Sequence, residues 1–270
     1  MMNKRICRMV LAVLLMLLST SALAWETPCF DGAANWQYED DARSIHIQKV
    51  SENNATWFVA DIQLASVEGF HADTSGDFAP VSELAKRTSA VLAVNGDDYG
   101  THKYGVIIRN GELLRTHDTT RNLLVIDANG DMSVKIDRKN EDYRALGTQL
   151  VEHQAWQSYE FGPELVRDGQ AVAFSTAFDV ISTKPSRLEP RTAIGQVGPL
   201  HYIVIVVDGR QDGYSAGMSL QDLQQLFVRY GAQTAMNLDG GGSAEMWFQG
   251  MIISSPSGGE ERYVSDIIWF

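Results

Sequence analysis

Apolar and polar positions alternate along much of the chain, which is the pattern of strands with one buried face. Residues 45–50 alternate strictly, and residues 56–64 are rich in aromatic and β-branched side chains, so both segments predict strands. Residues 201–207 (HYIVIVV) are almost wholly apolar, as a central strand covered on both faces would be. Further strands are predicted over residues 90–95, 232–238, 244–248, 251–254 and 263–270.

Helical periodicity is confined to two segments. Residues 80–87 predict a helix with proline in its first turn. A second helix is expected to start at Ser219, a typical N-cap residue, and its apolar positions repeat at helical spacing until Gly231. We therefore expect an α+β fold, with a mixed β-sheet core and a few flanking helices in a single domain. Turn dipeptides predict hairpins at residues 110–111, 128–130 and 168–169.

The first residues have the organisation of a signal peptide. Lys4, Arg5 and Arg8 precede an apolar run over residues 9–18, and Ala22-Leu23-Ala24 has the small-x-small form of a cleavage site. The run is shorter than the roughly 20 residues that a membrane span needs. We expect a signal peptide over residues 1–24, an N-terminal extension over 25–44 and one main domain over 45–270. The mature protein would be exported, periplasmic or secreted, with no stable membrane span.

Composition narrows the class of protein further. The chain has 270 residues, 44% of them hydrophobic, which excludes a disordered protein. Its formal charge of −12 would become −15 once the three basic residues of the signal peptide are removed, which argues against nucleic acid as a partner. Cleavage would also remove Cys7 and leave Cys29 alone, so stability must come from packing and not from an internal disulfide.

Polar clusters follow several of the apolar strands. A rigid sheet can direct side chains from such strand ends into a shared cleft. Glycines allow a backbone to approach a ligand, and their N–H groups can form a nest for an anion, while arginine offers a planar fork to phosphate. Each feature also has a structural interpretation, because Asp-Gly is a common turn, a terminal arginine often forms an ion pair, and three glycines can make a bulge. The clusters lie at residues 95–100, 191–192, 208–210 and 237–243.

The chain resembles the phosphodiester glycosidase family from about Val59 to its C-terminus. Seven motifs in order carry the resemblance, of which Asn237-Leu238-Asp239-Gly240-Gly241-Gly242-Ser243 is the most specific. The others are AVNGD (93–97), GVIIRNG (105–111), FGPELV (161–166), RTAIG (191–195), VDGR (207–210) and GMSL (217–220). Two departures bear on the substrate: Asp98 replaces a usual aromatic residue, and Ala244-Glu245 replaces a small hydroxyl pair.

The resemblance implies cleavage of the bond between an anomeric sugar carbon and a phosphate oxygen. A phosphate leaving group needs positive potential, which Arg191 and Arg210 can supply. The oxocarbenium-like sugar needs a carboxylate, for which Asp239 is the first candidate, Asp208 the second and Glu164 the third. The catalytic set is therefore Asp239, Asp208, Arg191 and Arg210, and the substrate-binding set is Asn95, Asp97, Glu164, Thr192, Asn237, Gly240, Gly241, Gly242 and Ser243.

Two other classes of function remain open from the sequence. A non-catalytic module that binds phosphorylated glycans would have the same motifs, and a metal-dependent phosphodiesterase would cut the P–O bond. The six histidines show no paired ligand spacing, so no metal is assigned. The sequence has no GxGxxG or P-loop pattern, and we expect no nucleotide cofactor. The expected partner is a phosphorylated carbohydrate substrate.

Overall fold

The computed structural model describes residues 27–73, 76, 78–136, 142–174 and 185–270. The predicted signal peptide and its cleavage site therefore lie outside the described residues. The predicted extension does include β1 (Trp36–Glu39), which pairs with β2 at the edge of the large sheet. No helix in the described part is long and apolar enough to cross a membrane.

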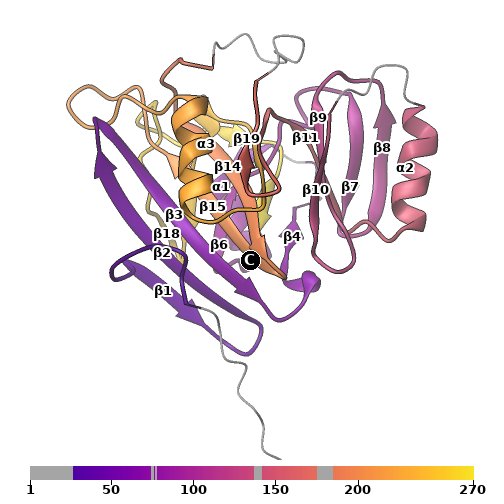
Figure 1. Ribbon diagram of the computed structural model, residues 1–270, viewed down its shortest axis with the longest axis horizontal. Helices are drawn as coiled ribbons and strands as arrows, with labels where there is room; N and C mark the ends of the chain where they lie inside the picture. The colour runs from indigo at the N-terminus through magenta and orange to yellow at the C-terminus, as the bar shows by residue number, and fades with distance from the viewer. Residues whose placement is uncertain (1–26, 74–75, 77, 137–141, 175–184) are drawn as a thin grey trace, which may run out of the picture.

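An eight-stranded sheet forms the centre of the molecule, in the order β1-β2-β3-β15-β14-β16-β12-β13 (Figure 1). All strand pairings among the described residues are antiparallel, so the expectation of a mixed sheet was wrong in this respect. The strands named after β1 span β2 Arg43–Glu52, β3 Ala55–Leu64, β12 Glu164–Arg167, β13 Gln170–Ala171, β14 Arg191–Gly198, β15 His201–Val207 and β16 Thr234–Asn237.

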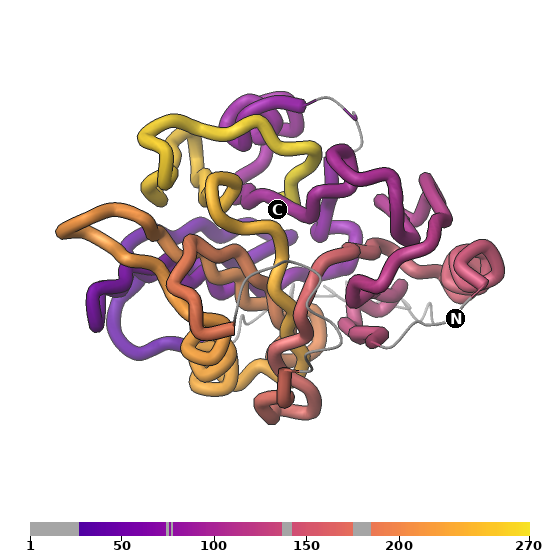
Figure 2. The backbone as a smooth tube through the Cα atoms, turned by 90° about the horizontal axis from the view of Figure 1, so that it is seen from above, coloured from indigo at the N-terminus to yellow at the C-terminus, as the bar shows by residue number. Residues whose placement is uncertain are grey.

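Smaller sheets pack around this centre. A five-stranded sheet has the order β18-β17-β6-β20-β4, a three-stranded sheet has the order β10-β9-β11, and β19-β5 and β7-β8 are ribbons. Their bounds are β4 His71–Ala72, β5 Ala79–Pro80, β6 Leu92–Asn95, β7 Gly105–Arg109, β8 Glu112–His117, β9 Asn122–Ile126, β10 Met132–Lys135, β11 Gln157–Phe161, β17 Met246–Phe248, β18 Met251–Ile252, β19 Tyr263–Val264 and β20 Ile267–Trp269. Figure 2 shows the C-terminal strands lying beside the segment that contains β6.

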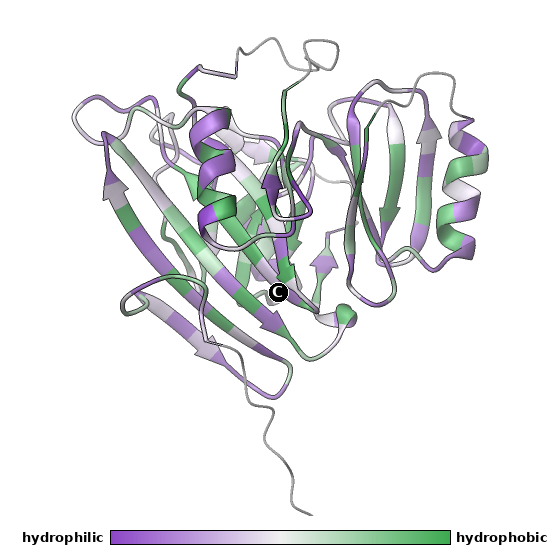
Figure 3. Cartoon of the chain, viewed as in Figure 1, coloured by the Kyte–Doolittle hydropathy of each residue, from purple (hydrophilic) through white to green (hydrophobic). Residues whose placement is uncertain are grey.

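Strand β15 explains how the core is built. All seven of its residues are buried, as the sequence predicted for a central strand. Tyr202, Val204 and Val206 face the core shared with the smaller sheets, and the alternate residues pack under α3. In Figure 3 hydrophobic residues concentrate on β3 and β15, and α3 has one hydrophobic and one hydrophilic side. Two cores therefore cover the two faces of one sheet.

Three α-helices lie in the described part of the chain: α1 (Val81–Thr88), α2 (Tyr143–Glu152) and α3 (Leu220–Arg229). The sequence predicted α1 and α3, and the Ser219 hydroxyl accepts a hydrogen bond from the Asp222 amide as the N-cap of α3. Helix α2 was not predicted. Its Gly147 lowers helical propensity, but a Cβ there would lie 2.5 Å from Thr116 of β8, so glycine permits close packing. The result is a β-rich member of the α+β class.

Candidate active site

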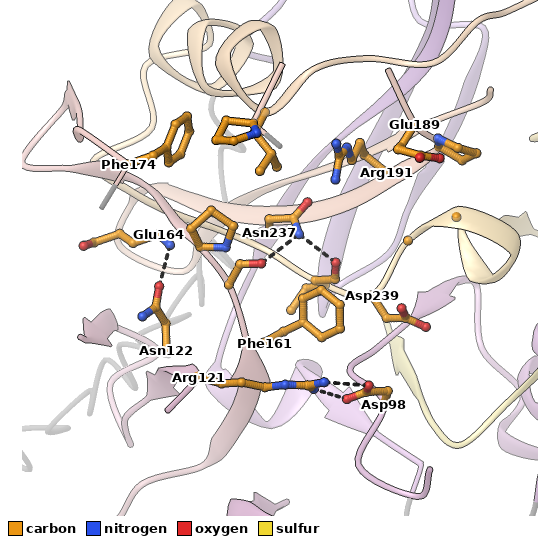
Figure 4. Close-up of a pocket in the computed structure, with 18 of the residues that line it drawn as sticks. Asp98, Arg121, Asn122, Phe161, Glu164, Phe174, Glu189, Arg191, Asn237 and Asp239 are labelled. Atoms are coloured by element: carbon orange, nitrogen blue, oxygen red, sulfur yellow. Dashed lines mark hydrogen bonds and ion pairs between the residues drawn. The ribbon is translucent and has the colours of Figure 1, made fainter. Parts of the chain in front are cut away.

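The main cavity measures about 870 Å³ and opens where β14 begins and β11 and β16 end. It brings together eight of the thirteen residues that the sequence nominated. These are Glu164, Arg191, Arg210, Asn237, Asp239, Gly240, Gly241 and Gly242. Figure 4 shows several of them together with Arg121, Asp98 and the rings of Phe161 and Phe174. The volume suits a ligand of sugar-phosphate size or larger.

Asp239 lies between β16 and the short 3-10 turn Gly241–Ser243, and it borders the cavity. Burial raises the pKa of its carboxyl group, and the negative charge of Asp98 adds to this. A hydrogen bond from the Ser243 side chain, one from the Gly240 amide and the charge of Arg262 act in the opposite direction. The net effect is a carboxyl group whose pKa lies above its ordinary value, which suits a role in proton transfer.

The glycine run holds this loop tightly against its neighbours. A Cβ on Gly240 would lie 2.8 Å from the Pro190 carbonyl oxygen, and Gly241 has a φ of 59°. The Gly241 amide donates a hydrogen bond to that same carbonyl at 2.9 Å, and the Gly240 amide donates one to the Asp239 side chain. Two of the three amides are therefore used inside the protein, and the expected three-glycine anion nest does not form.

Asn95 and Thr192 act behind the cavity wall, not at its surface. The Asn95 side-chain amide donates to the Asp239 backbone carbonyl at 2.6 Å. The Thr192 hydroxyl donates to the Asn95 side-chain oxygen at 2.7 Å, and both residues are buried. These contacts fix the backbone that presents Asp239. The predicted direct contact of either residue with substrate is not supported by their position.

Arg191 is a buried arginine without a counter-ion among the described residues. Its Nε donates to the Met218 carbonyl at 3.2 Å and its Nη2 to the Arg187 carbonyl at 2.9 Å. Burial and the charges of Arg210 and Arg187 lower its pKa to about 10, against the influence of Glu189, so it remains charged at neutral pH. A buried guanidinium held by carbonyls alone is suited to receive an anion.

Arg210 stands beside the glycine turn and is already paired. Its Nε donates to Glu189 Oε2 at 2.6 Å, and the other oxygen of Glu189 accepts from Arg187 at 2.5 Å. Glu189 is buried in the cavity wall and was not among the predicted residues. Its carboxylate fixes the guanidinium of Arg210 next to Gly241. Two arginines, Arg191 and Arg210, therefore converge on one wall of the cavity.

Asn237 and Glu164 line a different part of the cavity. The Asn237 side-chain nitrogen donates to the carbonyls of Gly162 and Leu238 at 2.9 and 3.0 Å. Its Oδ1 is buried and has no hydrogen-bond partner within the described structure, so it can accept from a ligand hydroxyl or amide. Glu164 is bound by Arg167, whose Nε donates to Oε1 at 3.0 Å. This pairing makes Glu164 a weaker candidate for the reacting carboxylate than Asp239.

The remaining nominated residues lie outside the main cavity. Asp208 is buried and accepts hydrogen bonds from the Tyr214 hydroxyl at 2.7 Å and the Ser255 amide at 2.8 Å. Burial raises the pKa of Asp208. Because its hydrogen bonds hold neighbouring loops and it lies outside the cavity, its position does not support the predicted catalytic role. Asp97 forms a buried ion pair with Arg109 at 3.0 Å. Asp97 and Ser243 border a smaller polar pocket of about 110 Å³, which Asp239 also lines.

An ion pair that sequence reasoning missed forms the opposite wall. Arg121 binds Asp98 through two hydrogen bonds, of which Nη2–Oδ2 measures 3.0 Å. Its guanidinium carbon lies 4.8 Å from the centre of the Tyr104 ring and 5.0 Å from that of Phe161. The sequence places Asp98 in the polar cluster 95–100 and marks it as a departure from the family pattern, but does not indicate an ion pair. Nothing in the sequence near Arg121 indicated its partner, which is 23 residues away.

No group of three histidine, cysteine, aspartate or glutamate side chains in the described ranges is arranged to hold a metal ion. Cys29 is a free thiol, and burial beside Asp61 raises its pKa.

Comparison with solved structures reveals a shared fold. The catalytic domain of zebrafish N-acetylglucosamine-1-phosphodiester alpha-N-acetylglucosaminidase, described as auto-inhibited by its pro-peptide, matches with a TM-score of 0.65 and 19% identity. That match covers 89% of this chain and 86% of the zebrafish chain. A hypothetical protein from Synechocystis matches with a TM-score of 0.64 and 13% identity over 85% of this chain and 62% of its own. At identities this low, the structural similarities show a shared fold and not a shared function.

Sequence comparison adds a related protein and a family model. A prophage-derived uncharacterized protein, YomE of Bacillus subtilis (strain 168), is 31% identical over 195 residues. The match covers 70% of this chain but 29% of the relative, so this chain spans less than a third of that protein's length. The family model described as phosphodiester glycosidase matches residues 88–270, which include the Asn237–Ser243 motif, Arg191 and Arg210. The chain therefore belongs to the phosphodiester glycosidase family.

Proposed function

We propose that this protein is an exported hydrolase that cleaves the anomeric C–O bond of a sugar-1-phosphodiester. The observation that carries the proposal is the placement of Asp239 in the same cavity as Arg191. Asp239 carries a carboxyl group on a loop that lines the cavity, and Arg191 is a buried cation without a carboxylate partner in the described part. A sugar whose anomeric oxygen belongs to a phosphate needs these two groups on its two sides.

Arg191 and Arg210 act on the phosphate side of the reaction. The diester is already an anion, and as the C–O bond breaks the electron pair passes to the phosphate oxygen. Arg191 stabilises this growing charge, and Arg210 stands beside it, held by Glu189. A phosphate monoester is a stable leaving group, so the reaction needs little help from a general acid.

Asp239 acts on the sugar side of the reaction. Positive charge develops on the anomeric carbon and ring oxygen, and a nearby carboxylate stabilises it as nucleophile or as base for water. The partnerless Oδ1 of Asn237 can accept a hydrogen bond from a sugar hydroxyl or acetamido group. The apolar wall around Phe161 and Phe174 leaves room for the rest of the diester.

Turnover of a defined diester tests the proposal. We expect purified protein to convert the methyl ester of N-acetylglucosamine-1-phosphate into free sugar and methyl phosphate, observed by phosphorus NMR. Asp239→Asn should lower kcat by roughly 10²–10⁴-fold, the usual contribution of a positioned acid or base. Asp212→Asn, on an exposed loop, is the matched control. Binding without turnover would instead support a non-catalytic phosphoglycan-binding module.

Export is a separate part of the proposal. It rests on the basic, apolar and small-residue segments of residues 1–24. Expressed in a bacterial host, the full chain should yield a processed form whose mass corresponds to a start at Trp25. An unprocessed cytoplasmic form as the sole product would contradict export without affecting the enzymatic proposal.

A further inference from the structure

A second, smaller pocket adjoins the main cavity at Asp239. Its volume is about 110 Å³, roughly one eighth of the main cavity and below the range of about 300–1,000 Å³ that ligand sites occupy. At about 30 Å³ per molecule it has room for a few waters but not for a sugar ring. The two spaces share four residues, which are Asp98, His102, Asp239 and Arg262.

The walls of this pocket are fixed and polar. Asp98 is held by Arg121 and by His102, whose Nε2 lies 3.2 Å from Oδ2. Asp97 is held by the buried Arg109. Hydroxyl groups complete the lining, among them those of Ser243 and Ser265. A buried water needs two to four polar partners, and this lining supplies them beside the Asp239 carboxylate.

The pocket lies away from Arg191 and Arg210, and the one arginine in its lining is Arg262. Arg191 and Arg210 border the main cavity and are absent from the lining of the smaller pocket. In Figure 4 Arg191 lies on one side of Asp239 and Asp98 on the other. A sugar whose phosphate is bound by the arginines would therefore turn the opposite face of its anomeric carbon toward the smaller pocket.

We infer that the smaller pocket supplies the hydrolytic water to the anomeric carbon from the face opposite the phosphate, so that the sugar is released with inverted configuration. This rests on the proposed function. The water oxygen bonds to the anomeric carbon while the C–O bond to phosphate breaks and its electron pair remains on the phosphate oxygen. One water proton passes to the Asp239 carboxylate, and the products are a free sugar and a phosphate monoester.

The anomer first released tests the inference. An α-linked sugar-1-phosphodiester, hydrolysed in a proton NMR tube, should yield the β-anomer before mutarotation mixes the two. Initial release of the α-anomer would overturn the inference while leaving the proposed hydrolysis intact. If the wild-type protein releases no sugar, the proposed function itself fails, and the inference fails with it.

A pocket-filling variant gives an independent measurement. Ser265→Leu places a larger side chain in the smaller pocket, and we expect at least a tenfold fall in kcat with KM nearly unchanged. Ser133→Leu on the exposed side of β10 is the matched control. A folded Ser265→Leu protein with wild-type kcat would overturn the inference. If that variant does not fold, the anomer measured with the wild-type protein decides the question.

Discussion

At the scale of single residues, the site depends on how buried charges are balanced. Arg109, Arg121 and Arg210 each face a carboxylate, whereas Arg191 is held only by backbone carbonyls in the described structure. An unpaired buried cation is costly for folding. Its presence in a cavity wall is explained if an anionic substrate completes the pairing.

Replacing Arg191 tests this interpretation. Arg191→Gln should lower kcat/KM for a sugar-1-phosphodiester by about 10²–10³-fold, the effect of losing one preorganised donor to a developing anion. Arg191→Lys should recover only part of the loss, because an ammonium group lacks the planar fork. Steady-state kinetics provide the measurement, with Arg229→Gln on the exposed face of α3 as control. Equal activity of Arg191→Gln and the control would remove Arg191 from phosphate binding.

The pH dependence of hydrolysis reports on Asp239. Burial raises its pKa above the ordinary value of 3.8, and a base or nucleophile must be deprotonated to act. Activity should therefore fall as the pH drops through a midpoint above 3.8, as read from the acidic limb of kcat/KM against pH. An acidic limb at or below pH 3.8 would show that the titrating group is not the buried Asp239.

At the scale of elements, the loop that precedes β19 is tied to the core by two carboxyl groups. Glu245 follows the glycine turn and is buried, and its side chain forms a hydrogen bond with Glu261. Glu261 in turn accepts from the amide and hydroxyl of Ser82 at 2.9 and 2.6 Å. Arg262, the next residue, borders both cavities, so this pair positions one edge of the site.

This pair should make stability depend on pH. Burial and the facing Glu261 raise the pKa of Glu245 to about 9, so the folded protein binds this proton more tightly than the unfolded chain. The stabilising contribution is complete below about pH 4.5 and is lost as pH rises toward 9. Glu261, whose pKa is lowered, has the opposite trend at acidic pH.

Glu245→Gln separates this effect from other titrations. The amide keeps a donor for Glu261 at every pH, so the decrease in Tm between pH 6 and 9 should be smaller than in the wild-type protein. Glu112→Gln on β8 is an exposed control. An identical Tm profile for Glu245→Gln and the wild-type protein would show that the two carboxyl groups do not share a proton.

At the scale of the whole molecule, one sheet supports both cores. Ile205 of β15 is fully buried in the core beneath α3, and its neighbours in sequence face the other core. Ile205→Ala should reduce the free energy of unfolding by about 2–5 kcal/mol, measured by urea denaturation. Met251→Ala, at a side chain 57% exposed, should change it little. A loss below 1 kcal/mol for Ile205→Ala would contradict the placement of β15 at the centre.

The sequence predicted those features that local patterns determine. Strand β15, helices α1 and α3 and the hairpin turn at Asn110-Gly111 follow from periodicity, caps and glycine. The antiparallel order of the large sheet could not be read this way, because pairing joins segments far apart in sequence. Helix α2 was not predicted because Gly147 weakens the local helical pattern, whereas tertiary packing favours the helix.

The same division holds for the site. The motif of residues 237–243 identified Asp239 and the glycine turn, since those residues are contiguous. The Arg121–Asp98 pair and the buried Glu189 depend on contacts between distant segments, and no local pattern indicates them. Asp208 also follows a buried strand and ranks second to Asp239 on sequence, and only the fold shows that it accepts hydrogen bonds from Tyr214 and Ser255.

The central claim is that the bond broken lies between the anomeric carbon and oxygen. Hydrolysis of a sugar-1-phosphodiester in oxygen-18 water, followed by mass spectrometry of both products, tests it most directly. We expect the label in the released sugar and none in the phosphate monoester. Label in the phosphate monoester would show attack at phosphorus and contradict the account.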